Sequence, residues 1–177
     1  MAKDELPEFD ERGCLPEGIY NPSVENFMER FVNLTERRKE LFEKYKQFTK
    51  LCNEAKGIEE HYVDGSYVTD KKEPGDIDLL ITFNDDVYDS DKSFNSYFKI
   101  TNQQEIMKKD YEMHVFYAKN TTDADSLDMQ IHWEKVRKKI LEWWSRFYID
   151  KENDIIDGKK KGFIVFNKDE LQQVEVW

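Results

Sequence analysis

The chain has 177 residues, with 38 acidic and 27 basic side chains, a formal net charge of −11 and 38% hydrophobic residues. This length predicts a single domain, because domains of roughly 100–200 residues are the common size. The sequence has no apolar run of roughly 18–20 residues and no apolar N-terminal stretch of signal-peptide type, which argues against a membrane or secreted protein. We therefore expect a cytoplasmic protein.

The acidic charge and the two cysteines bear on partners. A chain with a net charge of −11 is a poor general binder of phosphate backbones, because nucleic-acid affinity comes largely from Lys and Arg. A nucleotide substrate stays possible, since carboxylates can hold the magnesium that accompanies its phosphates. Cys14 and Cys52 are too few for a disulfide framework or a four-ligand zinc site, so we expect two unpaired thiols.

The first elements in chain order are an extended segment and a long helix. Residues 1–22 are rich in Pro and Gly and predict an extended N-terminal segment, followed by a domain over residues 23–177. Ser23 is a good helix cap, and Gly57 is a natural helix end. Apolar residues at three- and four-residue steps predict an amphipathic helix between them, through Leu41, Phe42, Tyr45, Phe48, Leu51, Cys52 and Ala55.

Strands and helices alternate in the rest of the chain. Strands are predicted at 58–63, 76–83, 111–119 and 163–166, short helices around 92–98 and 102–109, and a second long helix over 131–147. Trp143 and Trp144 are adjacent on that helix, so we expect one in the core and the other at the surface. The order of elements predicts the α/β class, with one sheet flanked by helices in a single domain.

Residues 63–78 carry the chemically informative pattern. Asp76 and Asp78 begin an apolar strand, and because side chains alternate across a strand, both carboxylates project from one face. Such carboxylates repel each other unless a cation lies between them, and Mg²⁺ takes oxygen ligands from one or two carboxylates plus substrate phosphates. Gly65 permits a tight turn, and Ser66 offers a hydroxyl and an N–H to a phosphate oxygen. The pattern predicts a site for magnesium and a nucleoside triphosphate.

The turn Gly65-Ser66, followed by Asp76-Ile77-Asp78, resembles the DNA polymerase beta-type nucleotidyltransferase superfamily. The resemblance implies a nucleotidyltransferase-like mixed sheet, with Gly65 and Ser66 at the triphosphate and Asp76 and Asp78 as ligands of the catalytic metals. It also implies transfer of a nucleoside monophosphate from a nucleoside triphosphate to an acceptor hydroxyl. Further stretches are similar to an uncharacterised prokaryotic branch of that superfamily, at 9–20, 65–69, 74–78 and 161–165.

The third carboxylate of that superfamily is missing where the resemblance places it, near His114. By alternation, Glu112, His114 and Phe116 are expected to share one face of the strand. Glu112 could act as the missing base or ligand, or His114 could act as the base near neutral pH. The departure leaves open a catalytically impaired module that binds a nucleotide or a protein partner.

Several alternatives stay open. Lys71 and Lys72 lie in the loop before the aspartates, where a cation could meet the leaving pyrophosphate, although loop lysines are usually just solvated. The basic run 159–161 is either a turn or a contact for an acidic partner. Asp76 and Asp78 could instead serve a turn and face solvent. The acceptor is a protein side chain or an RNA end, and the low pI favours protein. Small members of the superfamily are antitoxins that nucleotidylate a toxin, which suggests a toxin–antitoxin or phage-defence setting.

Overall fold

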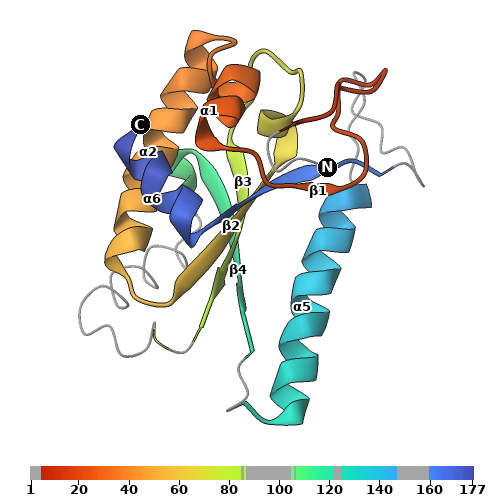
Figure 1. The fold of residues 1–177 in the computed structure, drawn as a ribbon, viewed down its shortest axis with the longest axis vertical. Helices are drawn as coiled ribbons and strands as arrows, with labels where there is room; N and C mark the ends of the chain where they lie inside the picture. Colours follow the sequence, from red (N-terminus) through yellow and green to blue (C-terminus); the bar gives the residue numbers. More distant parts are fainter. Residues whose placement is uncertain (1–4, 85, 87–104, 106, 122–124, 147–159) are drawn as a thin grey trace.

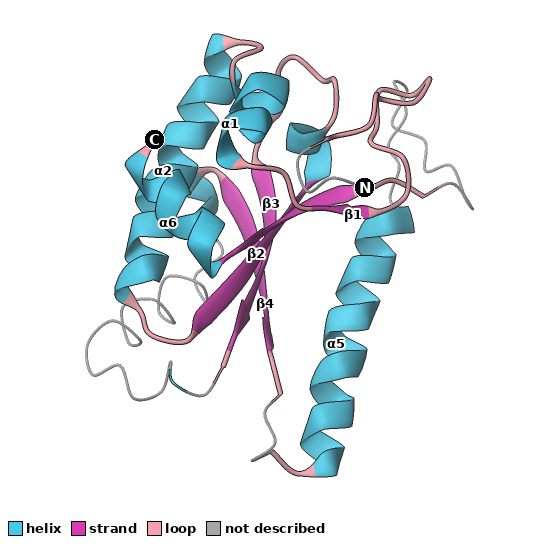
Figure 2. Cartoon of the chain, in the orientation of Figure 1, coloured by secondary structure: helices cyan, strands magenta, loops and turns pink. Residues whose placement is uncertain are grey.

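The centre of the computed structural model is a five-stranded mixed sheet in the order β1-β5-β2-β3-β4 (Figures 1 and 2). The structure describes residues 5–84, 86, 105, 107–121, 125–146 and 160–177. Strand β2 pairs antiparallel with both β3 and β5, whereas β3 with β4 and β1 with β5 are parallel. The strands are β1 (Ile19–Tyr20), β2 (Ile58–Asp64), β3 (Ile77–Phe83), β4 (Met113–Lys119) and β5 (Phe163–Asn167).

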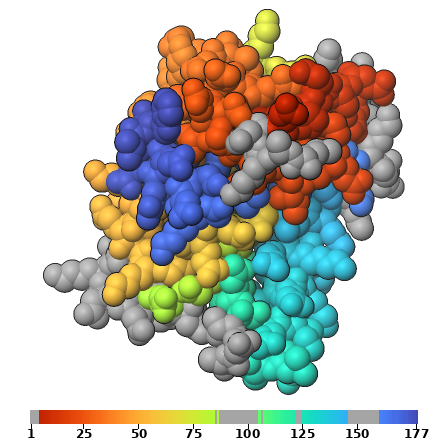
Figure 3. Space-filling model, viewed as in Figure 1, coloured from red at the N-terminus to blue at the C-terminus, as the bar shows by residue number. Residues whose placement is uncertain are grey.

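The helices cover the two faces of the sheet unequally (Figure 1). On one face lie α1 (Val24–Phe27), α2 (Glu36–Glu54) and α6 (Lys168–Val176), and on the other α5 (Leu127–Arg146). In Figure 3, α6 in dark blue lies against segments coloured orange and yellow. Short π-helical segments occupy Met28–Val32 (η1) and Met107–Tyr111 (η4), and a 3-10 turn occupies Gly65–Val68 (η2). The predicted α/β class, with a sheet flanked by helices in one domain, is confirmed.

Alternation along the strands divides the side chains between two clusters. The larger cluster includes Val63, Leu79 and Val115, which face α2 and its neighbours. The smaller one includes Tyr62 and Leu80, packed against Trp144 of α5 and other side chains of that helix. Because successive residues of a strand face opposite sides, the side covered by α5 is also the side on which Asp64, Asp78 and His114 project.

The predicted elements are found with small shifts. Ser23 caps α1, since its Oγ accepts a hydrogen bond of 3.2 Å from the N–H of Asn26. The helix expected between Ser23 and Gly57 is divided in the structure into α1, η1 and α2. Helix α2 begins only after Thr35, whose side chain accepts a hydrogen bond from the N–H of Arg38, and it ends at Glu54, close to the expected Gly57. The strand expected over 111–119 begins only at residue 113, because η4 runs through residue 111 and the next residue has a φ of 53°. The helix expected around 92–98 lies outside the described residues; of the 102–109 pattern, residue 105 is helical and 107–109 belong to η4.

Two elements were not predicted. The N-terminal segment, expected to be extended, contributes β1 to the sheet and buries Leu15 in the core. The C-terminal helix α6 begins with a capping box between Asn167 and Glu170. Trp144 is buried and Trp143 is exposed, as expected for adjacent helical residues.

Two expectations from sequence concern disulfide bonds and membrane-spanning helices. Cys14 and Cys52 form no disulfide in the structure, and both are buried. Among the helices in the described part of the chain, none is sufficiently long and apolar to cross a membrane.

Candidate functional site

Three titratable side chains lie in a row across neighbouring strands at one end of the sheet. Asp64 of β2 is paired with Asp78 of β3, and Asp78 is paired with His114 of β4. Residues directly opposite each other on adjacent strands project from the same face, with Cβ atoms about 5 Å apart. His114 Nδ1 lies 3.5 Å from Asp78 Oδ1. The sheet register therefore assembles this row from three separate strands.

The turn predicted from Gly65-Ser66 lies directly against this row. Strand β2 ends at Asp64, and Gly65, with a φ of 78°, turns the chain into η2. A Cβ atom at Gly65 would collide with the carboxylate of Asp78, so the close approach requires glycine. Asp76 immediately precedes β3, and its charge acts on Asp78. Of the residues predicted from sequence, the structure thus places Gly65 against Asp78, with Ser66 next in the same turn and Asp76 near enough for its charge to act on Asp78.

The carboxylate of Asp78 lies in a negative, poorly hydrated environment. Burial raises the pKa of Asp78 to about 7, and the neighbouring charges of Asp76 and Asp64 act in the same direction. Lys161 and Lys108 oppose the shift. We call Asp64, Asp76 and Asp78 the carboxylate cluster. The raised pKa therefore reflects burial first, and then the repulsion between neighbouring carboxylates.

Lys161 reaches the carboxylate cluster from the segment that precedes β5. Its Nζ donates to Asp64 Oδ1, and the two side chains are only 7% and 4% exposed. Burial raises the pKa of Asp64, while the charge of Lys161 lowers it. Neither residue was predicted from sequence as part of the site. Asp64 could have been found, because it ends an apolar strand next to Gly65, but no local pattern distinguishes Lys161 from the exposed Lys160 beside it.

Glu112 occupies a different place from the one expected. It lies outside β4 with a φ of 53°, so strand alternation does not extend from His114 to Glu112. Its carboxylate accepts two hydrogen bonds of 3.0 Å from Arg37 and one of 2.6 Å from Lys44, both on α2. These bonds lower the pKa of Glu112 to about 2. The structure therefore engages Glu112 in a contact between η4–β4 and α2, whereas His114 and Phe116 remain on the site face.

The loop with Lys71 and Lys72 is held by its backbone. The buried guanidinium of Arg38 donates to the carbonyl oxygens of Tyr67, Thr69 and Lys71, and Thr35 Oγ1 donates to that of Lys72. Both lysine side chains are exposed. Arg38 thus fixes the path of the backbone from η2 towards β3. A contact of Lys71 or Lys72 with pyrophosphate stays a prediction.

Asp76 and Asp78 could hold a magnesium ion. Mg²⁺ commonly binds one or two carboxylates and completes its shell with water and substrate phosphates. A divalent cation would favour the ionised form of Asp78, which burial and the charges of Asp76 and Asp64 disfavour. Within the described residues, no group of three or more His, Cys, Asp and Glu side chains is arranged to hold a metal by itself. The donor chemistry fits an ion that is bound jointly by protein and phosphate oxygens.

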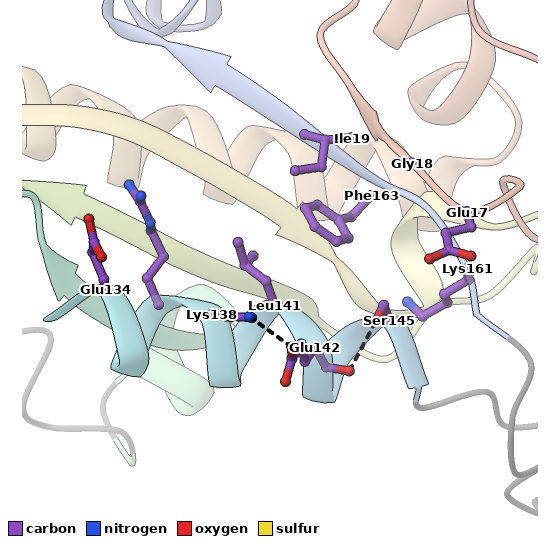
Figure 4. Close-up of a pocket in the computed structure, with 11 residues that line it drawn as sticks. Glu17, Gly18, Ile19, Glu134, Lys138, Leu141, Glu142, Ser145, Lys161 and Phe163 are labelled. Atoms are coloured by element: carbon purple, nitrogen blue, oxygen red, sulfur yellow. Dashed lines mark hydrogen bonds and ion pairs between the residues drawn. The ribbon is translucent and has the colours of Figure 1, made fainter. Parts of the chain in front are cut away.

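A pocket of about 500 Å³ adjoins the cluster on the side of α5 (Figure 4). It lies between α5 and the sheet edge formed by β1 and β5, and Ile19, Leu141 and Phe163 give it an apolar centre. Lys161 lines the pocket and also pairs with Asp64, so the pocket and the cluster share this residue. We call it the α5 pocket. Its charged lining residues are Glu17, Glu134, Arg137, Lys138 and Glu142.

Comparison with known proteins places the chain in a family. No curated protein and no solved structure matches it. One family model matches residues 7–167, which span all five strands and the whole carboxylate cluster. The chain therefore belongs to the family described as a family of unknown function, DUF6932.

Proposed function

We propose that the protein is a magnesium-dependent nucleotidyltransferase, which transfers a nucleoside monophosphate from a nucleoside triphosphate to an acceptor hydroxyl. One observation carries the proposal: the Gly65–Ser66 turn lies against Asp78, beside Asp76, at the end of β2 and β3. A turn that admits phosphate oxygens next to two crowded carboxylates is the combination that a metal-bound triphosphate needs. The sequence resemblance supports the same chemistry.

Each residue of the site has a role in this proposal. The turn at Gly65 leaves room for phosphate oxygens, and the hydroxyl of Ser66 donates a hydrogen bond to one of them. Asp76 and Asp78 hold magnesium, which when bound neutralises charge on the phosphates and on the leaving pyrophosphate. The exposed Lys71 and Lys72 are proposed to meet that pyrophosphate from the adjoining loop.

His114 is the proposed base. Its imidazole lies 3.5 Å from Asp78 and packs on the ring of Phe116 at 4.5 Å between ring centroids, which orients it on the site face. It accepts the proton of the acceptor hydroxyl as that oxygen forms its bond to the α-phosphorus. The bond from the α-phosphorus to the bridging oxygen breaks, and pyrophosphate leaves with the bonding electrons.

The α5 pocket supports a protein as the acceptor. It adjoins the carboxylate cluster at Lys161, and its apolar centre suits a side chain of a peptide segment. Three glutamates and three basic residues line it, so the preference for protein over RNA rests on the apolar centre and on the net charge of −11 of the chain. A toxin partner, modified by this protein in a toxin–antitoxin or phage-defence setting, is one protein acceptor of this kind.

A second candidate is a nucleotide-binding module with impaired catalysis. Two observations favour it: the residue opposite Asp78 on β4 is His114 and not a carboxylate, and Glu112 is engaged by Arg37 and Lys44. Such a module would bind a nucleotide with magnesium but would not transfer it.

The experiment incubates the protein with each α-³²P-labelled nucleoside triphosphate, magnesium, and separate protein and RNA acceptors. We expect label on the protein acceptor, and loss of transfer by about 100-fold or more in Asp76→Ala/Asp78→Ala, because the metal ligands are gone. Glu73→Ala, an exposed carboxylate of the same loop, is the matched control and keeps full transfer. Transfer that persists in the double variant contradicts the assignment. Magnesium-dependent nucleotide binding without transfer to any acceptor favours the binding module.

A further inference from the structure

The buried pair of Asp64 and Lys161 sets the charge available to a metal at this site. We infer that Lys161 withholds Asp64 from the metal, so that the site binds one divalent cation, and binds it together with the triphosphate. This inference rests on the proposed function and adds the number of metal ions and their dependence on nucleotide.

The position of Asp64 in the sheet makes its carboxylate a potential metal ligand. Asp64 projects from the same face as Asp78 and is directly opposite it in the sheet, so its carboxylate lies where a third metal ligand could come from. Its Oδ1 instead accepts a charge-assisted hydrogen bond from Lys161 Nζ. Both side chains are more than nine-tenths buried, and separating such a pair leaves an uncompensated buried charge.

Backbone hydrogen bonds and close packing hold Lys161 in its position. Its backbone N–H donates to the carbonyl oxygen of Ser145 at 3.0 Å, and the N–H of Gly162 donates to that of Leu15 at 2.9 Å. A Cβ atom at Gly162 would collide with the carbonyl oxygen of Pro16, so the backbone is closely packed at this point. The lysine is therefore anchored at both α5 and the N-terminal segment.

The charges and the carboxylate ligands of the site favour a single divalent cation. With all three carboxylates ionised, the carboxylate cluster and Lys161 together carry two negative charges, which one divalent cation neutralises. His114 on β4 supplies no carboxylate and Lys161 pairs with Asp64, so a second divalent cation would have no carboxylate ligand of its own. Asp76 and Asp78 alone give few protein ligands, so phosphate oxygens are needed to complete the shell.

The experiment uses Mn²⁺ as the probe, measured by electron paramagnetic resonance and calorimetry on the full chain. It compares Mn²⁺ alone with Mn²⁺ plus non-hydrolysable α,β-methylene analogues of the four nucleoside triphosphates. For the wild type we expect one Mn²⁺ per chain, bound at least about tenfold more tightly when an analogue is present. Two Mn²⁺ per chain, or equal affinity with and without every analogue, overturns the inference.

A set of variants isolates the role of Lys161. Lys161→Met frees Asp64 to act as a further carboxylate ligand, and we expect Mn²⁺ alone to bind about tenfold more tightly. Asp64→Asn added to Lys161→Met removes the freed carboxylate and returns the affinity to that of the wild type. Lys160→Met, whose exposed ammonium pairs with Glu17, is the matched control and changes nothing. A folded Lys161→Met variant that behaves like this control overturns the inference.

The outcomes separate the inference from the proposed function. A wild type that binds two Mn²⁺ and transfers nucleotide refutes only the single-metal inference. A wild type that binds no analogue with Mn²⁺ refutes the proposed function and the inference with it. If Lys161→Met does not fold, the stoichiometry of the wild type decides.

Discussion

Gly65 shows at the scale of one residue how backbone conformation and site chemistry depend on each other. Its φ of 78° is unfavourable for any residue with a Cβ, and a Cβ here would also displace the carboxylate of Asp78. The glycine is therefore required twice, once for the turn and once for the approach of the turn to β3. A change confined to one methyl group should affect both stability and the site.

We predict that Gly65→Ala destabilises the fold by about 1–3 kcal/mol, because an L-residue is strained at this φ and meets Asp78. Magnesium-dependent nucleotide binding should fall in the same variant, since Asp78 must move. Urea unfolding and calorimetric titration measure the two effects. Gly75→Ala is the control, because a Cβ there has no neighbour within 4 Å. A Gly65→Ala protein that binds nucleotide like the control would show that the turn does not shape the site.

Single residues also mark the limit of prediction from sequence. Gly65, Ser66, Asp76 and Asp78 could be predicted because they lie in one short segment, where strand alternation and turn chemistry act locally. The pair of Asp64 and Lys161 spans 97 positions, and that of Arg37 and Glu112 spans 75. Such partners are fixed only by the packing of distant elements, which a single sequence does not reveal.

At the scale of elements, Glu112 joins the start of β4 to α2. Arg37 and Lys44 lie on α2, and both donate to this one carboxylate. Their hydrogen bonds lower the pKa of Glu112 to about 2. The folded state therefore binds fewer protons at Glu112 than the unfolded state between about pH 2 and pH 4.5, and the free energy of unfolding rises with pH across this window.

We predict that Glu112→Gln lowers the free energy of unfolding by about 1–3 kcal/mol at pH 7, because charge-assisted hydrogen bonds are lost. The difference from the wild type should shrink as the pH falls from 4.5 towards 2, since protonation removes the same bonds. Urea unfolding at several pH values measures this. Glu43→Gln, an exposed partner of Lys46 on α2, should change little at any pH. A Glu112→Gln deficit that does not vary with pH would contradict the ion-pair origin.

Some helices and strands can be predicted from the sequence, and others cannot. Long helix α2 and strands β2 and β3 follow from periodic apolar residues, whose spacing is set by the element itself. Strand β1 has two residues, too few for any period, and it exists because β5 offers it a parallel partner. Helix α6 was missed although Asn167 and Glu170 form a capping box that the sequence displays.

At the scale of the whole molecule, the carboxylate cluster and the α5 pocket adjoin each other on the face of the sheet that α5 covers. Helix α5 is the described helix on that face, and it leaves Ile19 of the edge strand 56% exposed beside Leu141 and Phe163. The net charge of −11 includes the carboxylate cluster and the glutamates around the pocket. We propose that the carboxylate cluster holds a metal-bound nucleotide, and the net charge of the whole chain favours a protein acceptor over a nucleic-acid track.

The last prediction tests the pocket as the acceptor site. Ile19→Arg places a long charged side chain at the apolar centre of the α5 pocket, where it should oppose the acceptor. We expect transfer to a protein acceptor to fall at least about tenfold, because the arginine replaces the apolar contact of Ile19 and places a charged group where the acceptor would bury apolar surface, while Mn²⁺-dependent nucleotide binding stays unchanged. Leu34→Arg, at a residue 50% exposed and outside the pocket lining, is the matched control. Equal transfer by both variants would place the acceptor elsewhere, whereas loss of nucleotide binding in Ile19→Arg would make the pocket part of the nucleotide site.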